Sequence, residues 1–128
     1  MTENQIAKVV FDSALKVHRA LGPGLLESSY EECLYYELLR NQLTVEKQKA
    51  LPLIYEEIKL EVGYRVDLMV ENKFIVEIKS VEALNDVHLA QILTYLKLSN
   101  CKLGLLINFN VSLLKNGVKR VINGKIDT

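Results

Sequence analysis

The sequence predicts one α/β domain of the α+β kind, in which a mixed β-sheet is flanked by helices. Three observations predict it: apolar residues at helical spacing near the start, a middle part rich in Val, Ile, Leu and Tyr, and a nearly continuous apolar run near the end. With 128 residues, 49% hydrophobic and 25% charged, the chain is long enough to bury a core. We therefore expect a single domain over residues 1–128 with the element order α-α-β-β-β-α-β.

The first two elements are expected to be helices over residues 3–21 and 27–41. Thr2 and Gln5 have the spacing of a capping box at the start of the first helix. Gly22-Pro23-Gly24 ends it, because proline cannot continue the hydrogen-bond ladder. The first helix carries apolar residues three and four positions apart, which places them on one stripe: Ile6, Val9, Val10, Ala14, Val17 and Leu21.

Three strands are expected next, over residues 45–55, 58–70 and 74–80, as an antiparallel meander. The segments are rich in β-forming residues. Turn-like residues separate them, Glu56-Glu57 between the first two and Glu71-Asn72-Lys73 between the last two.

The remaining chain returns to helical spacing and then to strand. Residues 86–99 repeat apolar positions as one face of a helix. Residues 102–109 are almost continuously apolar, which is typical of a strand buried on both faces. A last short strand is expected over residues 118–122.

Charge and targeting signals restrict the function classes. The chain has 16 basic and 16 acidic residues, which argues against a protein that coats nucleic acid by bulk electrostatics. It has no apolar run long enough for a membrane span and no signal-peptide layout at its start. Cys33 and Cys101 match no metal or redox spacing, so we expect packing roles and a cytoplasmic protein with no membrane partner.

The segment from Ser112 to Thr128 is locally basic. Its only acidic residue is Asp127, against four basic residues: Lys115, Lys119, Arg120 and Lys125. Such a segment can contact a phosphate backbone or simply form a solvated basic face, and the sequence leaves both interpretations open.

Asp67 and Glu77 are predicted to lie opposite each other on the second and third strands. If their hairpin turns about Asn72, Asp67 faces Glu77. Because side chains alternate between faces, Lys79 shares the face of both carboxylates. Opposed carboxylates repel each other and are poor sheet neighbours, so this pair is expected only where another group offsets the repulsion.

A divalent cation is such a group. Mg²⁺ prefers oxygen ligands and is held by one or two carboxylates plus substrate phosphate, so we expect the carboxylates of Asp67 and Glu77 within about 6 Å of each other. The alternative is that both point to solvent from one wet face, paired with Lys79 and Arg65. Their apolar neighbours along each strand favour partial burial, which is costly for a charge without a partner.

These residues resemble a known family. Asp67, a gap of nine, and Glu77-Ile78-Lys79 resemble the D…ExK core of the PD-(D/E)XK nuclease superfamily, with Val66 where the family name has proline. Gly24-Leu25-Leu26-Glu27-Ser28-Ser29-Tyr30 is similar to the signature of the small prokaryotic GxxExxY proteins, a branch of that superfamily. The likeness continues through four further segments: Val17-His18-Arg19, Tyr64-Arg65-Val66-Asp67, His88-Leu89-Ala90-Gln91 and Leu105-Leu106-Ile107-Asn108-Phe109.

The resemblance implies a restriction-endonuclease-like core and assigns roles. Asp67, Glu77 and the backbone carbonyl of Ile78 would bind Mg²⁺ or Mn²⁺, which activates water and polarises the phosphate. Lys79 would orient or activate the attacking water and stabilise developing charge. Glu27 resembles an additional acidic site residue and further metal ligand; the alternative is a helix-start carboxylate favoured by the macrodipole.

A helix face and two aromatic residues complete the expected site. His88, Gln91 and Tyr95 share one side of the helix over residues 86–99. The resemblance turns this side to the active centre, where Gln91 could hold a water or phosphate oxygen; the alternative is a polar edge beside the core. Tyr30 is a supporting candidate, although Tyr30 and His18 could instead be core residues with a buried hydrogen bond.

The function expected from this sequence is metal-dependent hydrolysis of phosphodiester bonds in nucleic acid, DNA before RNA. The alternative is a catalytically silent module of the same fold that binds nucleic acid or a protein. Asp67, Glu77 and Lys79 are all present, which favours the enzyme. A homodimer or another protein partner stays open.

Overall fold

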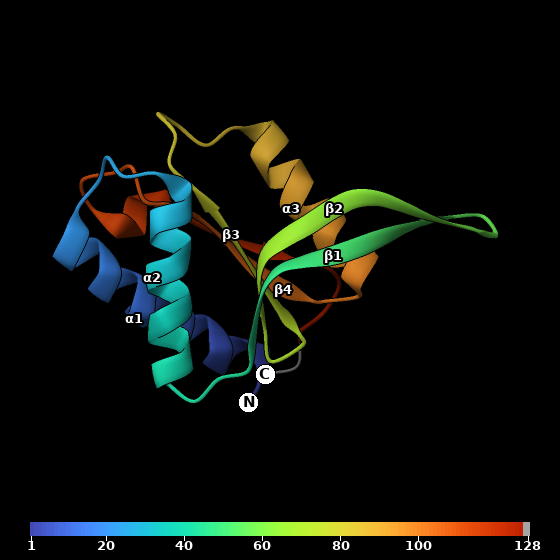
Figure 1. Ribbon diagram of the computed structural model, residues 1–128, viewed down its shortest axis with the longest axis horizontal. Helices are drawn as coiled ribbons and strands as arrows, with labels where there is room; N and C mark the ends of the chain where they lie inside the picture. Colours follow the sequence, from blue (N-terminus) through green and yellow to red (C-terminus); the bar gives the residue numbers. More distant parts are fainter. Residues whose placement is uncertain (127–128) are drawn as a thin grey trace.

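The computed structural model describes residues 1–126, and their element order is that expected from the sequence, with one addition (Figure 1). The helices are α1 (Glu3–Leu21), α2 (Glu27–Arg40) and α3 (Asp86–Ser99). The strands are β1 (Val45–Tyr55), β2 (Ile58–Val70), β3 (Phe74–Lys79), β4 (Leu103–Asn108) and β5 (Val118–Ile122). The addition is a 3-10 turn, η1 (Leu114–Gly117), before β5.

The strands form one mixed sheet in the order β1-β2-β3-β4-β5. β3 and β4 run parallel, and the other neighbours are antiparallel. The meander over β1, β2 and β3 is therefore confirmed. β2 pairs Met69 with Ile75 of β3, the register that a turn about Asn72 predicts.

The helices cover the two faces of the sheet. α1 and α2 pack together on one face and α3 packs on the other (Figure 1). The larger core joins α1 and α2 to the sheet through fully buried Ile6, Leu34 and Phe74. The smaller joins α3 to it through Ile92, Leu96 and Ile75. The predicted burial of β4 is confirmed, since all its residues are buried.

Local sequence explains how the elements are placed. Thr2 and Gln5 form the predicted capping box at the start of α1. At Gly104 of β4, a Cβ would lie 2.8 Å from the Ile75 carbonyl oxygen and 3.2 Å from Ile92 Cδ1. This glycine therefore allows α3 to pack closely on the strands that carry the candidate site.

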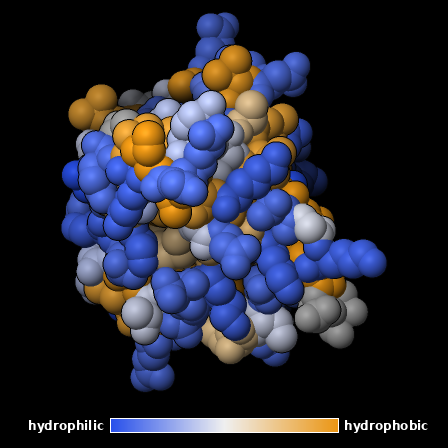
Figure 2. Space-filling view, turned by 90° about the vertical axis from the view of Figure 1, so that its right-hand side faces the viewer, coloured by the Kyte–Doolittle hydropathy of each residue, from blue (hydrophilic) through white to orange (hydrophobic). Residues whose placement is uncertain are grey.

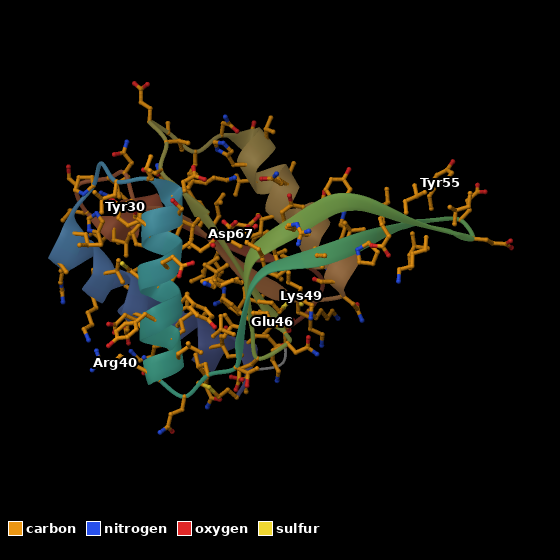
Figure 3. All side chains as sticks on the ribbon, in the orientation of Figure 1. Tyr30, Arg40, Glu46, Lys49, Tyr55 and Asp67 are labelled. Atoms are coloured by element: carbon orange, nitrogen blue, oxygen red, sulfur yellow. The ribbon has the colours of Figure 1, made fainter. Side chains whose placement is uncertain are left out.

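β1 and β2 extend beyond the rest of the sheet as a projecting arm (Figure 1). The arm carries exposed apolar side chains, including Ile54, Tyr55 and Ile58. Seen from the side to which it points, hydrophilic side chains surround separate hydrophobic areas (Figure 2). Tyr55 lies at the far end of the arm, whereas Asp67 lies at its base, between α2 and α3 (Figure 3).

Both cysteines are free thiols that pack against the cores, Cys101 buried and Cys33 half-buried. In the basic segment Lys115, Lys119, Arg120 and Lys125 are exposed, and Arg120 donates to Asn4 Oδ1; Asp127 and Thr128 lie outside the described residues. Within residues 1–126, no helix combines the length and apolar character that crossing a membrane requires.

Candidate active site

The candidate site begins where the ladder between β2 and β3 ends. Backbone pairing of the two strands runs only as far as Leu68 and Val76. At the next position, Asp67 N donates to Glu77 Oε2 at 2.8 Å, and Ile78 N donates to Asp67 Oδ2 at 2.8 Å. Each carboxylate thus accepts a hydrogen bond from the backbone of the opposite strand. The two strands are held together here by the site residues themselves.

Glu77 is a buried carboxyl group, with 4% of its surface exposed. Burial raises its pKa to about 9, and the charge of Asp67 adds to the shift, while the hydrogen bond from Asp67 N and the charge of Lys79 oppose it. The interpretation in which both carboxylates point to solvent is therefore wrong for Glu77; Asp67 is half-buried. Arg65 does not compensate them in the described structure, because its guanidinium donates to Gln48 O.

α3 brings polar groups to Lys79. Lys79 Nζ donates to Gln91 Oε1 at 3.3 Å. Tyr95, one helical turn after Gln91, is buried. Its pKa is raised mainly by burial and further by the negative charges of Glu77 and Asp67. The same side of α3 therefore faces the lysine and both carboxylates.

Glu27 holds the chain that follows Lys79. Its Oε2 accepts a hydrogen bond from Ser80 N at 3.1 Å, while Ser80 Oγ donates to Leu25 O at 2.7 Å. The buried amide of Asn108 accepts from Val81 N at 3.1 Å and donates to Val81 O at 3.0 Å. The segment after β3 is thereby fixed to the start of α2 and to the end of β4.

Tyr30 and His88 both make hydrogen bonds to nearby backbone groups. Tyr30 OH donates to Gly22 O at 2.6 Å and accepts from Leu25 N at 3.1 Å, which fixes the loop before α2. His88 caps α3: Asn85 N donates to His88 Nδ1 at 3.2 Å.

Tyr30 also stacks on Phe109, with ring centroids 4.4 Å apart. His18 is buried, and its Nε2 lies 2.8 Å from Val111 O. Both residues have the buried hydrogen bonds expected of core residues.

Two further residues, Gln48 and Glu31, lie at the site and were not predicted from the sequence. Gln48 of β1 donates from Nε2 to Asp67 Oδ1 at 3.1 Å and to Glu31 Oε1 at 2.7 Å. The pKa of Glu31 is raised, chiefly by burial and further by the charge of Asp67, while Gln48 opposes the shift. Helical spacing could have indicated Glu31, because it lies one turn after Glu27. Predicting that Gln48 lies at the site would require knowing how β1 pairs with β2.

The donor atoms fit a hard divalent cation. Asp67 and Glu77 supply carboxylate oxygens whose mutual repulsion a cation would relieve. Because the N–H and C=O of one strand residue point to the same side, and Ile78 N–H points to β2, the Ile78 carbonyl points to that side too. Within residues 1–126, no three His, Cys, Asp or Glu side chains group closely enough to hold a metal, so Glu27 stands apart from the pair. Two carboxylates would leave positions for water and phosphate, as Mg²⁺ sites commonly do.

A hollow of about 420 Å³ opens beside Asp67. α2 lines it with Glu27, Ser28 and Glu31, and β1 with Gln48. The hollow gives the Asp67 side of the site an approach from solvent. Its acidic walls would repel a bare phosphate, so a cation would be needed to bring one in.

Comparisons with known proteins identify the family. The model of the PD-(D/E)XK nuclease superfamily matches residues 4–121. No curated protein matches the chain. One solved structure, described as the crystal structure of SSO0001, is 15% identical with a TM-score of 0.42, covering 96% of this chain and 80% of that one. On the family match over residues 4–121, this chain belongs to the PD-(D/E)XK nuclease superfamily.

Proposed function

We propose that the protein is a metal-dependent nuclease that hydrolyses phosphodiester bonds in nucleic acid, DNA in preference to RNA. The observation that carries this proposal is that Asp67 and Glu77 meet where β2 and β3 separate, with the charge of Lys79 acting on Glu77. An acidic pair beside a lysine suits phosphoryl chemistry, since the carboxylates can bind a cation and the ammonium can stabilise developing negative charge.

The proposed cation ligands are Asp67, Glu77 and the Ile78 carbonyl, for Mg²⁺ or Mn²⁺. Glu27 lines the hollow beside Asp67 but stands apart from the pair, so it could become a further ligand only if its side chain moved towards the cation. When bound, the cation would polarise the scissile phosphate and lower the pKa of a coordinated water. Burial of Glu77 supports this assignment, because a buried carboxylate without a cation is costly.

Lys79 is the proposed catalytic residue that orients the attacking water and stabilises charge on the phosphate oxygens. Gln91 accepts a hydrogen bond from its ammonium and limits the positions that Lys79 can adopt. Tyr95 and His88 are supporting residues on the same helix. Tyr95 is buried close enough to the carboxylates for their charges to raise its pKa, whereas His88 orders the first turn of α3.

We also assign the chain to the GxxExxY branch and to the cytoplasm of a prokaryotic cell. The order and spacing of Gly24, Glu27 and Tyr30 support the branch assignment, and the contacts of Glu27 and Tyr30 give the motif a structural role. Glu27 holds Ser80 beside the ExK strand, and Tyr30 fixes the Gly22–Leu25 loop that leads into α2. The motif would thus shape the segment that carries Lys79.

The test is a cleavage assay on single-stranded, double-stranded and branched DNA and on RNA, with Mg²⁺, Mn²⁺ or a chelator. We expect cation-dependent cleavage by the parent protein and none by an identically purified Asp67→Asn variant. Equal cleavage by both would identify contamination by host nuclease and contradict the proposal. Binding of nucleic acid without cleavage by either would favour the catalytically silent module instead.

A further inference from the structure

Gln48 lies opposite Asp67 across the two strands of the arm. Its neighbours Lys47 and Lys49 pair with Leu68 and Val66, so Gln48 and Asp67 occupy the intervening position. The Gln48 amide nitrogen donates to Asp67 Oδ1 at 3.1 Å and to Glu31 Oε1 at 2.7 Å. One amide group therefore links β2 to α2 through two carboxylates.

The chemistry of the amide fixes which end faces the acids. An NH₂ group has two donors, whereas the amide oxygen only accepts and would repel two carboxylates. Asp67 is consequently held at both oxygens, by Ile78 N at Oδ2 and by Gln48 at Oδ1. A carboxylate bound at both ends has little freedom to rotate away from a ligand position.

The backbone of Gln48 adopts a conformation that glutamine disfavours. Its φ is 50°, in the left-handed region that glycine occupies readily and other residues at a cost. Arg65 Nη1 donates to Gln48 O at 3.2 Å and so helps to hold this bend. Glycine would suit the backbone better but would lack the amide, so the amide is the feature that makes glutamine useful here.

We propose that Gln48 is a positioning residue: through its link to Glu31 it holds the Asp67 carboxylate in the orientation that receives the divalent cation. The inference rests on the proposed function, because it concerns the same cation site. Gln48 acts through Asp67 and is not itself a cation ligand or a catalytic residue. Outer contacts of this kind to a ligand carboxylate commonly change metal affinity by about ten- to a hundredfold.

The experiment compares Gln48→Gly with the parent protein, Asp67→Asn and a matched control, Gln42→Gly. Gln42 is exposed in the turn after α2 and has a φ of 63°. Both glycine variants therefore relieve the strain of a left-handed backbone, and both increase the conformational entropy of the unfolded chain. Mn²⁺ affinity is measured by titration of the free protein, without nucleic acid. The thermal midpoint of each metal-free variant is measured alongside.

We expect Gln48→Gly to bind Mn²⁺ at least about tenfold more weakly than the parent, with a thermal midpoint within about 4 °C of Gln42→Gly. Unchanged Mn²⁺ affinity in Gln48→Gly overturns the inference, and so does an equal loss of affinity in Gln42→Gly. If the parent binds Mn²⁺ and Asp67→Asn does not, the proposed function survives either of those results. Absence of Mn²⁺ binding by the parent would overturn both.

Discussion

Asp67 and Glu77 are joined through the backbone rather than through a direct ladder pair. Glu77 Oε2 accepts from Asp67 N, and Asp67 Oδ2 accepts from Ile78 N, one residue beyond Glu77. This exchange ties two acidic side chains to the point where β2 and β3 separate. A buried acid at such a position makes both folding stability and cation affinity depend on pH.

The first prediction concerns stability. The folded-state pKa of Glu77 is about 9, against an ordinary value of 4.5. Between those values the folded state holds a proton that the unfolded state has released, so folding stability falls as pH rises from about 4.5 to about 9. Glu77→Gln removes this dependence and retains an oxygen that can accept from Asp67 N. We therefore expect Glu77→Gln to raise the thermal midpoint of the metal-free protein by several degrees at pH 8.

Thermal denaturation in chelator at pH 5 and pH 8 measures this effect. Glu56→Gln, at an exposed turn position of the arm, is the control and should leave the pH dependence unchanged. A Glu77→Gln midpoint below that of the parent at pH 8 would show that the buried group is ionised and well compensated.

The second prediction concerns cation affinity. A divalent cation favours the ionised form of Glu77 and must displace the proton held there. Because that proton is bound up to about pH 9, we expect Mn²⁺ affinity to rise by up to about tenfold per pH unit between pH 6 and pH 9. Calorimetry in buffers of different ionisation enthalpy counts the released protons. An affinity independent of pH over this range would place the cation away from Glu77.

The third prediction concerns the loop before α2. Tyr30→Phe keeps the ring that stacks on Phe109 but removes the hydroxyl that bonds Gly22 O and Leu25 N. Leaving these backbone groups without their partner should cost about 1–3 kcal/mol of unfolding free energy. Denaturant unfolding measures it, with exposed Tyr36 changed to Phe as a control expected to be neutral. Equal stability of the two variants would indicate that water replaces the hydroxyl.

The β2–β3 half of the site was predictable because it depends on local patterns. The turn about Asn72 joins β2 directly to β3, and Asp67 and Glu77 both lie close to it in the sequence, so the turn determines the register and brings them together. The change of hydrophobic period located the strands and α3. The burial of Glu77 followed from the apolar residues around it.

The β1 half was not predictable in the same way. At the tip of the arm Tyr55 pairs with Ile58, and this register carried inward would place Glu46 opposite Asp67. The irregularity between Leu51 and Leu53 shifts the pairing by two residues, which brings Gln48 there instead. A shift of two preserves the faces of the strands, so the hydrophobic pattern gives no sign of it. The 3-10 turn η1 is too short to show a hydrophobic period. His88 occupies the third helical position of α3, where the usual capping box has Glu or Gln, so its capping role was not predicted.

The most direct test of the proposed nuclease activity is the effect of Lys79→Ala on cleavage and on binding of the same DNA. Lys79 would act mainly as charge develops in the transition state, so its loss should reduce single-turnover cleavage by about two orders of magnitude or more. DNA affinity should change little, because one phosphate contact is a small part of the electrostatic attraction. Lys97→Ala, an exposed lysine at the end of α3, should match the parent in both. Cleavage by Lys79→Ala equal to that of the parent would contradict the assignment of Lys79 as the catalytic lysine.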